Sequence, residues 1–345
     1  MERRNGSDNG HLGLFLAAGI GTCLAARAAV RRQRSMDLRG RAVLISGGSR
    51  GLGLVMAREF LARGSRVAIC ARDADELDRA REELTRRGSD VFTVVCDVTL
   101  RDEVDRMVRA VEDRFARIDV LVNNAGTIMM GPGETMTLAD DEQAMRTHFW
   151  APLYTTLAVL PGMKRHREGR IVNISSIGGK VPAPHLAPYV ASKFALTGLS
   201  ESLRAELIKD GVYVTTINPG LMRTGSPRNA FFKGQHRREY ALFKLADSLP
   251  GMSISAERAA RRIVTACQRG ESEVILSLTA NIAARFHGLF PGVSTELFSF
   301  IGQLLPGPGG VGARHVRGHD SESAVTRSFL TRLTDRSAAA NNEIR

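Results

Sequence analysis

From residue 41 onward the chain alternates short apolar runs with longer segments of helical periodicity, and this alternation limits the fold more than any other feature. The runs are rich in β-branched residues and are apolar at nearly every position, which is typical of strands buried on both faces of a sheet. Each is followed by a segment that can cross the sheet as a helix, so successive strands lie parallel. The sequence therefore predicts a doubly wound α/β domain with a seven-stranded parallel sheet and helices on both faces. The expected strands are 42–45, 67–70, 91–95, 120–122, 171–174, 212–217 and 274–276.

The 345 residues exceed what this domain needs. We expect the α/β domain at 38–277, preceded by a hydrophobic and basic leader at 1–37. Residues 278–305 are apolar and broken by Pro291-Gly292, which predicts a helical extension. Residues 306–345 are rich in Gly, Ser, Arg, Asp and Ala, and we expect them to be disordered because they offer little to bury.

The net charge of +12 is spread along the chain. The leader has the highest charge density, and basic residues are not interleaved with aromatic ones as in a groove that follows nucleic-acid phosphates. We expect no nucleic-acid partner. The four cysteines show no metal-ligand spacing, so no metal site is predicted, and reduced thiols indicate a cytoplasmic catalytic domain.

The leader contains a nearly uncharged stretch at 12–30, interrupted by Arg27. A spanning helix needs about 20 apolar residues, so this stretch is marginal. An anchor or a helix on the membrane surface is favoured over a soluble leader, and a cleaved secretory signal is the third alternative.

A glycine-rich loop, SGGSRGLG at 46–53, stands between the first strand and the following helix. Glycines there permit a tight turn and let backbone N–H groups approach a pyrophosphate at the helix N-terminus. This position makes the loop a specific signal for a dinucleotide site. The candidate residues are Gly47, Ser49, Arg50, Gly51, Leu52 and Gly53.

The loop resembles the TGxxxGxG motif of the short-chain dehydrogenase/reductase superfamily, with Ser46 in place of Thr. Three later segments resemble the same superfamily, and the resemblance covers residues 38–277. It implies a Rossmann-type fold and adds further cofactor-binding residues. These are Asp97 and Val98 at the adenine, Asn124, Ala125 and Gly126 of an NNAG motif, and Pro219, Gly220 and Thr224 over the nicotinamide.

The end of the second strand bears on the choice of nicotinamide cofactor. An acidic residue there would bind the ribose 2′-hydroxyl, but the sequence has Arg72. Arg72 and Arg50 can pair with a 2′-phosphate through charge-assisted hydrogen bonds. We expect NADP(H). NAD is the less favoured alternative, and it stays open because Asp73, an acidic residue, adjoins Arg72.

The catalytic candidates are Ser176, Tyr189 and Lys193. Tyr189 and Lys193 are four residues apart, so they share one helix face. Hydride delivery to a carbonyl builds negative charge on oxygen, which needs a hydrogen-bond donor and a proton. The resemblance implies Tyr189 as acid/base, Lys193 as the partner that lowers its pKa and holds the ribose, and Ser176 as the group that orients the substrate.

His148 stands where superfamily members usually have Asn, a residue associated with a water relay to the lysine. It is either a functional replacement, since His can donate and accept hydrogen bonds, or a packing residue.

The segment 221–254 lies where the superfamily has its substrate lid. It is aromatic and basic, which suits a hydrophobic acyl, steroid or retinoid-like ketone or alcohol. The equally weighted alternative is a mobile surface helix–loop whose Phe residues face the domain. The set of Ser176, Tyr189 and Lys193 favours an oxidoreductase over the alternative, an inactive NADP-binding regulator or scaffold, because a pure binder needs no acid/base. Relatives imply a homodimer or homotetramer formed through the helices expected at 140–165 and 188–209.

Overall fold

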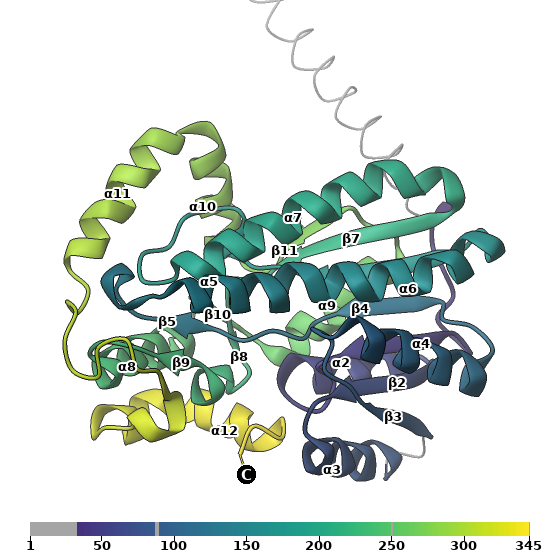
Figure 1. Ribbon diagram of the computed structural model, residues 1–345, viewed down its shortest axis with the longest axis horizontal. Coiled ribbons are helices and arrows are strands. Elements are labelled where there is room, and N and C mark those ends of the chain that lie inside the picture. Colours follow the sequence, from purple (N-terminus) through teal and green to yellow (C-terminus); the bar gives the residue numbers. More distant parts are fainter. Residues whose placement is uncertain (1–32, 87–89, 250, 345) are drawn as a thin grey trace, which may run out of the picture.

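The computed structural model describes residues 33–86, 90–249 and 251–344. Its centre is a seven-stranded parallel sheet in the order β11-β7-β6-β4-β1-β2-β3 (Figure 1). This confirms the predicted fold class. The strands are β1 (Ala42–Ser46), β2 (Arg66–Ala71), β3 (Val91–Val95), β4 (Val120–Asn123), β6 (Gly169–Ile174), β7 (Val212–Asn218) and β11 (Glu273–Ile275).

Helices cover both faces of the sheet, and alternating side chains of each strand supply the two cores. In β1, Val43 and Ile45 pack in the core shared with α2, α3 and α9. Ala42 and Leu44 pack in the opposite core with α4, α6 and α7. These helices are α2 (Gly51–Ala62), α3 (Ala74–Thr85), α4 (Arg101–Phe115), α6 (Ala151–His166), α7 (Ala187–Leu207) and α9 (Ala256–Gln268).

The helix expected at 140–165 is divided. It consists of α5 (Leu138–Met145), a π-helical turn (Arg146–Trp150) and α6. The π-helical turn carries His148, whose side chain is 1% exposed. Such turns insert one extra residue into a helix and are frequent at functional sites.

Two small sheets and one helix build the lid beside the main sheet. β8 (Leu221–Arg223) pairs with β10 (Ser253–Ser255), and β9 (Phe231–Phe232) lies between β5 (Met129–Met130) and β12 (Val316–Arg317). Helix α8 (His236–Ser248) packs over them, and Phe232 and Tyr240 are fully buried within this unit. The lid is therefore a folded layer with a core of its own.

The C-terminal region departs from expectation. Residues 278–303 form a hairpin of α10 (Leu278–Leu289) and α11 (Pro291–Gln303). Residues 306–344 were expected to be disordered, and this is wrong: they form short helical turns and α12 (Arg332–Ala340) against the lid (Figure 1). They pack through small side chains, since Thr326, Thr331 and Ala338 are fully buried.

The apolar leader segment at 12–30 lies outside the described residues. Within the part of the chain that the structure describes, no helix is both long and apolar enough to cross a bilayer. Cys70, Cys96 and Cys267 are buried free thiols.

Candidate active site

The predicted site residues meet at one edge of the sheet. Strands β1, β2, β3, β4, β6 and β7 are parallel, so the loops that follow them gather where their carboxyl ends lie. A cleft of about 670 Å³ opens there. All the predicted residues line it except Gly53: Gly47, Ser49, Arg50, Gly51, Leu52, Arg72, Asp97, Val98, Asn124, Ala125, Gly126, His148, Ser176, Tyr189, Lys193, Pro219, Gly220 and Thr224.

The glycine loop is shaped by backbone geometry that larger residues resist. Gly47 and Gly51 have φ of 64° and 54°, in the left-handed region. A Cβ at Gly53 would lie 2.0 Å from the carbonyl oxygen of Gly47. Gly53 therefore permits close packing of the loop against α2 and does not face the cleft.

The NNAG segment holds the glycine loop in place. The Asn124 amide donates to the carbonyl oxygens of Ser46 and Gly47, at 3.1 and 3.0 Å. The Ser46 hydroxyl accepts from the backbone N–H groups of Asn124 and Ala125. Ser46, which replaces the usual Thr, thus joins the ends of β1 and β4.

The residues expected at a 2′-phosphate are engaged with acidic groups. Arg50 forms an ion pair with Glu76 at 3.2 Å, and the Ser49 hydroxyl donates to the same carboxylate. The Arg72 side chain is 71% exposed and lies 3.8 Å from Asp97. Both guanidinium groups border the cleft, but a phosphate would have to compete with these carboxylates for them.

The catalytic candidates come together from two elements. Ser176 follows β6, while Tyr189 and Lys193 lie one turn apart on α7. Burial raises the pKa of Tyr189, and a hydrogen bond with the Ser176 hydroxyl acts in the opposite direction. Tyr189 is therefore protonated at neutral pH in this structure, as a proton donor must be.

Lys193 lies beneath the tyrosine and is 5% exposed. Its Nζ atom is 5.6 Å from the centre of the Tyr189 ring and donates to the carbonyl oxygen of Ile174 at 2.8 Å. Burial lowers the pKa of Lys193 to about 7. Its charge therefore changes in the physiological range.

Hydrogen bonds fix both the place and the tautomer of His148. Nε2 accepts from the backbone N–H of Thr127 at 3.2 Å, so the ring proton belongs on Nδ1. Nδ1 lies 2.8 Å from the hydroxyl of Ser192, which donates to the carbonyl oxygen of Tyr189. Burial, reinforced by the Lys193 ammonium, holds the pKa of His148 well below its usual range. The neutral ring thus ties the NNAG loop to the backbone of the tyrosine.

We predict that His148→Asn lowers kcat/KM about tenfold, because the shorter side chain cannot span both contacts. The pH–rate profile should keep its shape, since the imidazole does not titrate in the working range. Assaying wild type, His148→Asn and His148→Ala from pH 5.5 to 9 tests this. A shifted profile in His148→Asn would instead identify a proton-transferring group.

Three acidic residues that line the cleft were missed by the sequence analysis. Glu76 and Glu343 come from α3 and from the segment after α12, and Asp247 comes from the lid helix. Asp247 is 2% exposed, one of its oxygens has no hydrogen-bond partner, and burial raises its pKa to about 8. No motif marks these residues: Glu76 lies in the first turn of α3, and only the packing of the lid and of the C-terminal segment brings Asp247 and Glu343 to the cleft.

Comparison with known proteins agrees with this geometry. The short chain dehydrogenase family matches residues 41–232, and the chain belongs to this family. A dehydrogenase/reductase SDR family protein 7-like of Anopheles gambiae is 34% identical over 79% of this chain and 86% of its own length. The 11-beta-hydroxysteroid dehydrogenase 1A of Arabidopsis thaliana is 36% identical over 58% of each chain. The structure of L-sorbose reductase from Gluconobacter frateurii, complexed with NADPH and L-sorbose, superposes with a TM-score of 0.62 at 27% identity, covering 70% of this chain and 97% of that one. The general class of this protein is therefore an NAD(P)-dependent oxidoreductase.

Proposed function

We propose that this protein is an NADP(H)-dependent reductase of ketones, or dehydrogenase of secondary alcohols, whose substrate is hydrophobic. The observation that carries the proposal is the grouping of Ser176, Tyr189 and Lys193 in the cleft that also contains the glycine loop. A binding protein needs no acid/base group beside its nucleotide site. The catalytic domain corresponds to residues 38–277.

Ser176 and Tyr189 act on the oxygen of the substrate. Bound in the cleft, NADPH would supply a hydride to the carbonyl carbon and leave as NADP⁺. The Ser176 hydroxyl donates a hydrogen bond to the carbonyl oxygen, and the Tyr189 hydroxyl gives that oxygen its proton, which completes the alcohol. In the oxidative direction the tyrosine takes the proton back.

Lys193 supports the tyrosine. After Tyr189 has lost its proton, an ammonium below the ring favours the phenolate. The 5.6 Å separation allows this interaction across the aromatic face. The resemblance to the short-chain dehydrogenase/reductase superfamily implies that Lys193 also donates a hydrogen bond to the nicotinamide ribose.

The preference for NADP(H) rests on the positions of Arg50 and Arg72 at the border of the cleft. We predict that Arg72→Ala and Arg50→Ala each lower kcat/KM for NADPH about tenfold and change kcat/KM for NADH less than twofold. Arg285→Ala, on the exposed face of α10, is the matched control. A wild-type kcat/KM that is lower for NADPH than for NADH would overturn the preference.

The lid supports a hydrophobic substrate. Phe231 and Phe243 line the cleft, whereas Phe232 and Tyr240 form the core of the lid. Two of the basic lid residues are already paired: Arg228 with Glu322 and Lys233 with Asp140. The face toward the substrate is therefore mainly apolar, which fits an acyl, steroid or retinoid-like ketone.

The rival hypothesis is a regulator or scaffold that binds NADP without turnover. Oxidation of NADPH by the purified protein over a panel of hydrophobic ketones separates the two. Turnover that is lost in Tyr189→Phe supports the reductase. Tight NADPH binding without turnover on any ketone would favour the regulator.

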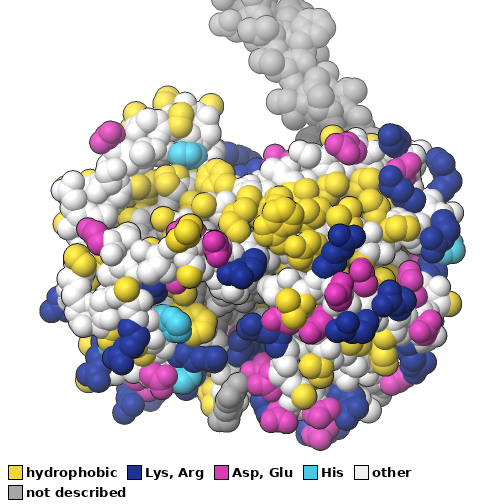
Figure 2. Space-filling view, in the orientation of Figure 1, with side chains coloured by type: hydrophobic (Ala, Val, Ile, Leu, Met, Phe, Trp, Pro, Cys, Tyr) yellow, Lys and Arg dark blue, Asp and Glu magenta, His cyan; other side chains and the backbone are white. Residues whose placement is uncertain are grey.

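A homodimer or homotetramer would use the surface of α6 and α7. Figure 2 shows apolar side chains gathered over these helices. Leu157 of α6, Phe194 of α7 and Trp150 of the adjoining π-helical turn are 50%, 41% and 42% exposed. Light scattering after size-exclusion chromatography tests this, and a monomeric mass would contradict it.

A further inference from the structure

The C-terminal segment reaches from the lid to the glycine loop, and it has two differently anchored parts. We call residues 322–335 the root and residues 341–343 the tip. Helix α12 begins within the root, leads to the tip and packs against α8 and β8 (Figure 1). Its residue Ala338 is fully buried against Gly225.

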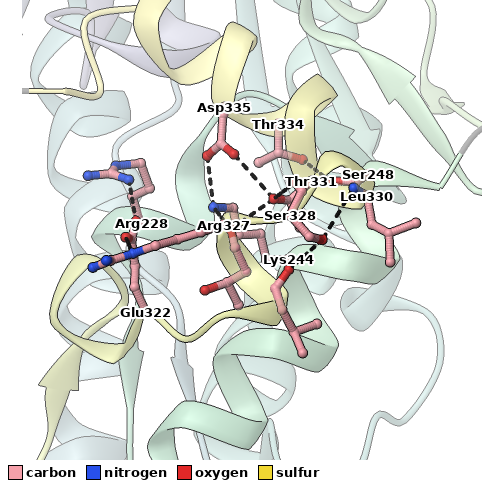
Figure 3. Close-up of polar contacts among 12 residues, drawn as sticks. Arg228, Lys244, Ser248, Glu322, Arg327, Ser328, Leu330, Thr331, Thr334 and Asp335 are labelled. Carbon is pink, nitrogen blue, oxygen red and sulfur yellow. Dashed lines mark hydrogen bonds and ion pairs between the residues drawn. The ribbon is translucent and has the colours of Figure 1, made fainter.

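The root is fastened to the lid by buried polar contacts (Figure 3). The Lys244 side chain of α8 is 1% exposed; its Nζ donates to the carbonyl oxygen of Thr326 at 2.7 Å and pairs with Asp335 at 2.8 Å. The hydroxyls of Ser248 and Thr334 are 2.6 Å apart. Because leaving the buried Lys244 amine without a partner would be costly, the root stays on the lid.

The tip lies on the cofactor loop. The backbone N–H of Gly51, at the start of α2, donates to the carbonyl oxygen of Asn341 at 2.8 Å. The Asn342 amide donates to the carbonyl oxygens of Ser49 and Glu76, at 2.9 and 3.1 Å. The tip thus takes up a donor at a helix N-terminus, where anions bind.

Glu343 brings a carboxyl group to the same place. Its carboxylate is 3.7 Å from the Arg50 guanidinium and accepts from the Asn229 amide of the lid. It lies so close over Gly51 that a Cβ on that residue would be 2.5 Å from its oxygen. At this helix N-terminus and beside this arginine, the carboxyl group of Glu343 takes partners that a phosphate would use.

We propose that the tip is an internal competitor of the cofactor, and that the phosphate groups of NADP(H) must displace residues 341–343 from Gly51 and Arg50 in order to bind. This rests on the proposed function, because it concerns the same cofactor site. The tip leaves while the root remains, so cofactor binding also frees the lid from the glycine loop. One feature of the docked tip favours its release. The side-chain amide nitrogen of Asn341 is buried without a hydrogen-bond partner in the described structure, which costs free energy while the tip is docked.

The competition depends on pH. Burial raises the pKa of Glu343 to about 7; Arg50, Arg228 and the hydrogen bond from Asn229 oppose the rise, and the neighbouring Glu76 adds to it. In the displaced tip the pKa returns toward its ordinary value near 4.5. The docked tip therefore binds the proton more tightly, so docking is strongest at low pH and weakens as pH rises from about 4.5 to 7. Competition with the cofactor should follow the same course.

The test compares NADPH binding by the wild type with that of a chain lacking residues 341–345 and of the full-length variant Asn342→Ala/Glu343→Ala, which removes the polar contacts of both side chains. Fluorescence titration should show Kd about tenfold lower for both variants at pH 6, and a smaller difference at pH 8. Glu296→Gln, on the exposed face of α11, is the control and should bind like the wild type. Thermal melts establish that each variant is folded.

Hydrogen exchange of the unmutated protein gives an independent readout. Adding NADP⁺ should increase exchange in residues 338–344 while leaving the root protected. An unchanged or higher Kd in the variants, or increased protection of the tip on binding, would overturn the competition even if turnover is intact. If no variant binds NADPH or NADH, the proposed function fails and the competition fails with it.

Discussion

Replacing Tyr189 by phenylalanine is expected to lower kcat at least ~10³-fold, because it removes the proton donor and a hydrogen bond that strengthens as charge develops on the substrate oxygen. The change deletes one hydroxyl. The ring keeps its edge contact with His148, at 5.3 Å between centroids, and its place above Lys193. Kd for NADPH should therefore stay within about twofold. Steady-state kinetics with the best ketone and a fluorescence titration measure both quantities.

The matched control is Tyr213→Phe, which removes a hydroxyl from a ring on β7 that lies against the guanidinium groups of Arg170 and Arg204. This variant should turn over like the wild type. Wild-type kcat in Tyr189→Phe would remove the tyrosine from the mechanism.

Replacing Lys193 by methionine is expected to reduce activity and to stabilise the fold. We predict a fall in kcat/KM of roughly 10²–10⁴-fold, since the phenolate of Tyr189 loses its cationic neighbour. The same change removes a buried ammonium. Because the pKa of Lys193 falls from 10.5 to about 7 on folding, burial of the lysine costs stability wherever the unfolded chain holds the proton more tightly.

The destabilisation caused by burying Lys193 depends on pH. It is largest below pH 7, shrinks between pH 7 and 10.5, and is absent above that range. At pH 6 the methionine variant should be more stable by roughly 1–3 kcal/mol, because loss of the hydrogen bond to Ile174 offsets part of the gain. Urea denaturation at pH 6 and pH 10 measures the difference. Equal or lower stability of the variant at pH 6 would show that the buried Lys193 ammonium does not destabilise the fold.

The sheet and the meeting of the glycine loop and the NNAG segment at its edge could be predicted, because the sequence signals for them are local. Continuous apolar runs indicate strands buried on both faces, and the carboxyl ends of parallel strands meet at one edge. Motifs after β1, β4, β6 and β7 therefore had to meet, whatever the details of packing. Gly53 is the one predicted cofactor residue that the cleft does not include, since its role is close packing against the Gly47 carbonyl.

Features that depend on tertiary contacts could not be predicted. Hydrophobic periodicity does not distinguish a continuous helix at 140–165 from one with a π-helical turn, although that turn carries His148. The C-terminal segment has few large apolar residues, so its composition indicated disorder. It is ordered because two residues far away in sequence hold it. The buried amine of Lys244 donates to the carbonyl oxygen of Thr326, and Gly225, which has no side chain, leaves room for Ala338. Glu343 reaches the cofactor loop only as a consequence of that docking.

The transfer of hydride itself is the most direct test of the proposed function. The purified protein is incubated with a hydrophobic ketone and NADPH carrying deuterium at both C4 positions, and the alcohol is analysed by mass spectrometry. We predict that the alcohol gains one deuterium on the former carbonyl carbon, and that Tyr189→Phe forms almost none of it. NADPH that binds tightly while no ketone yields labelled alcohol would contradict the account.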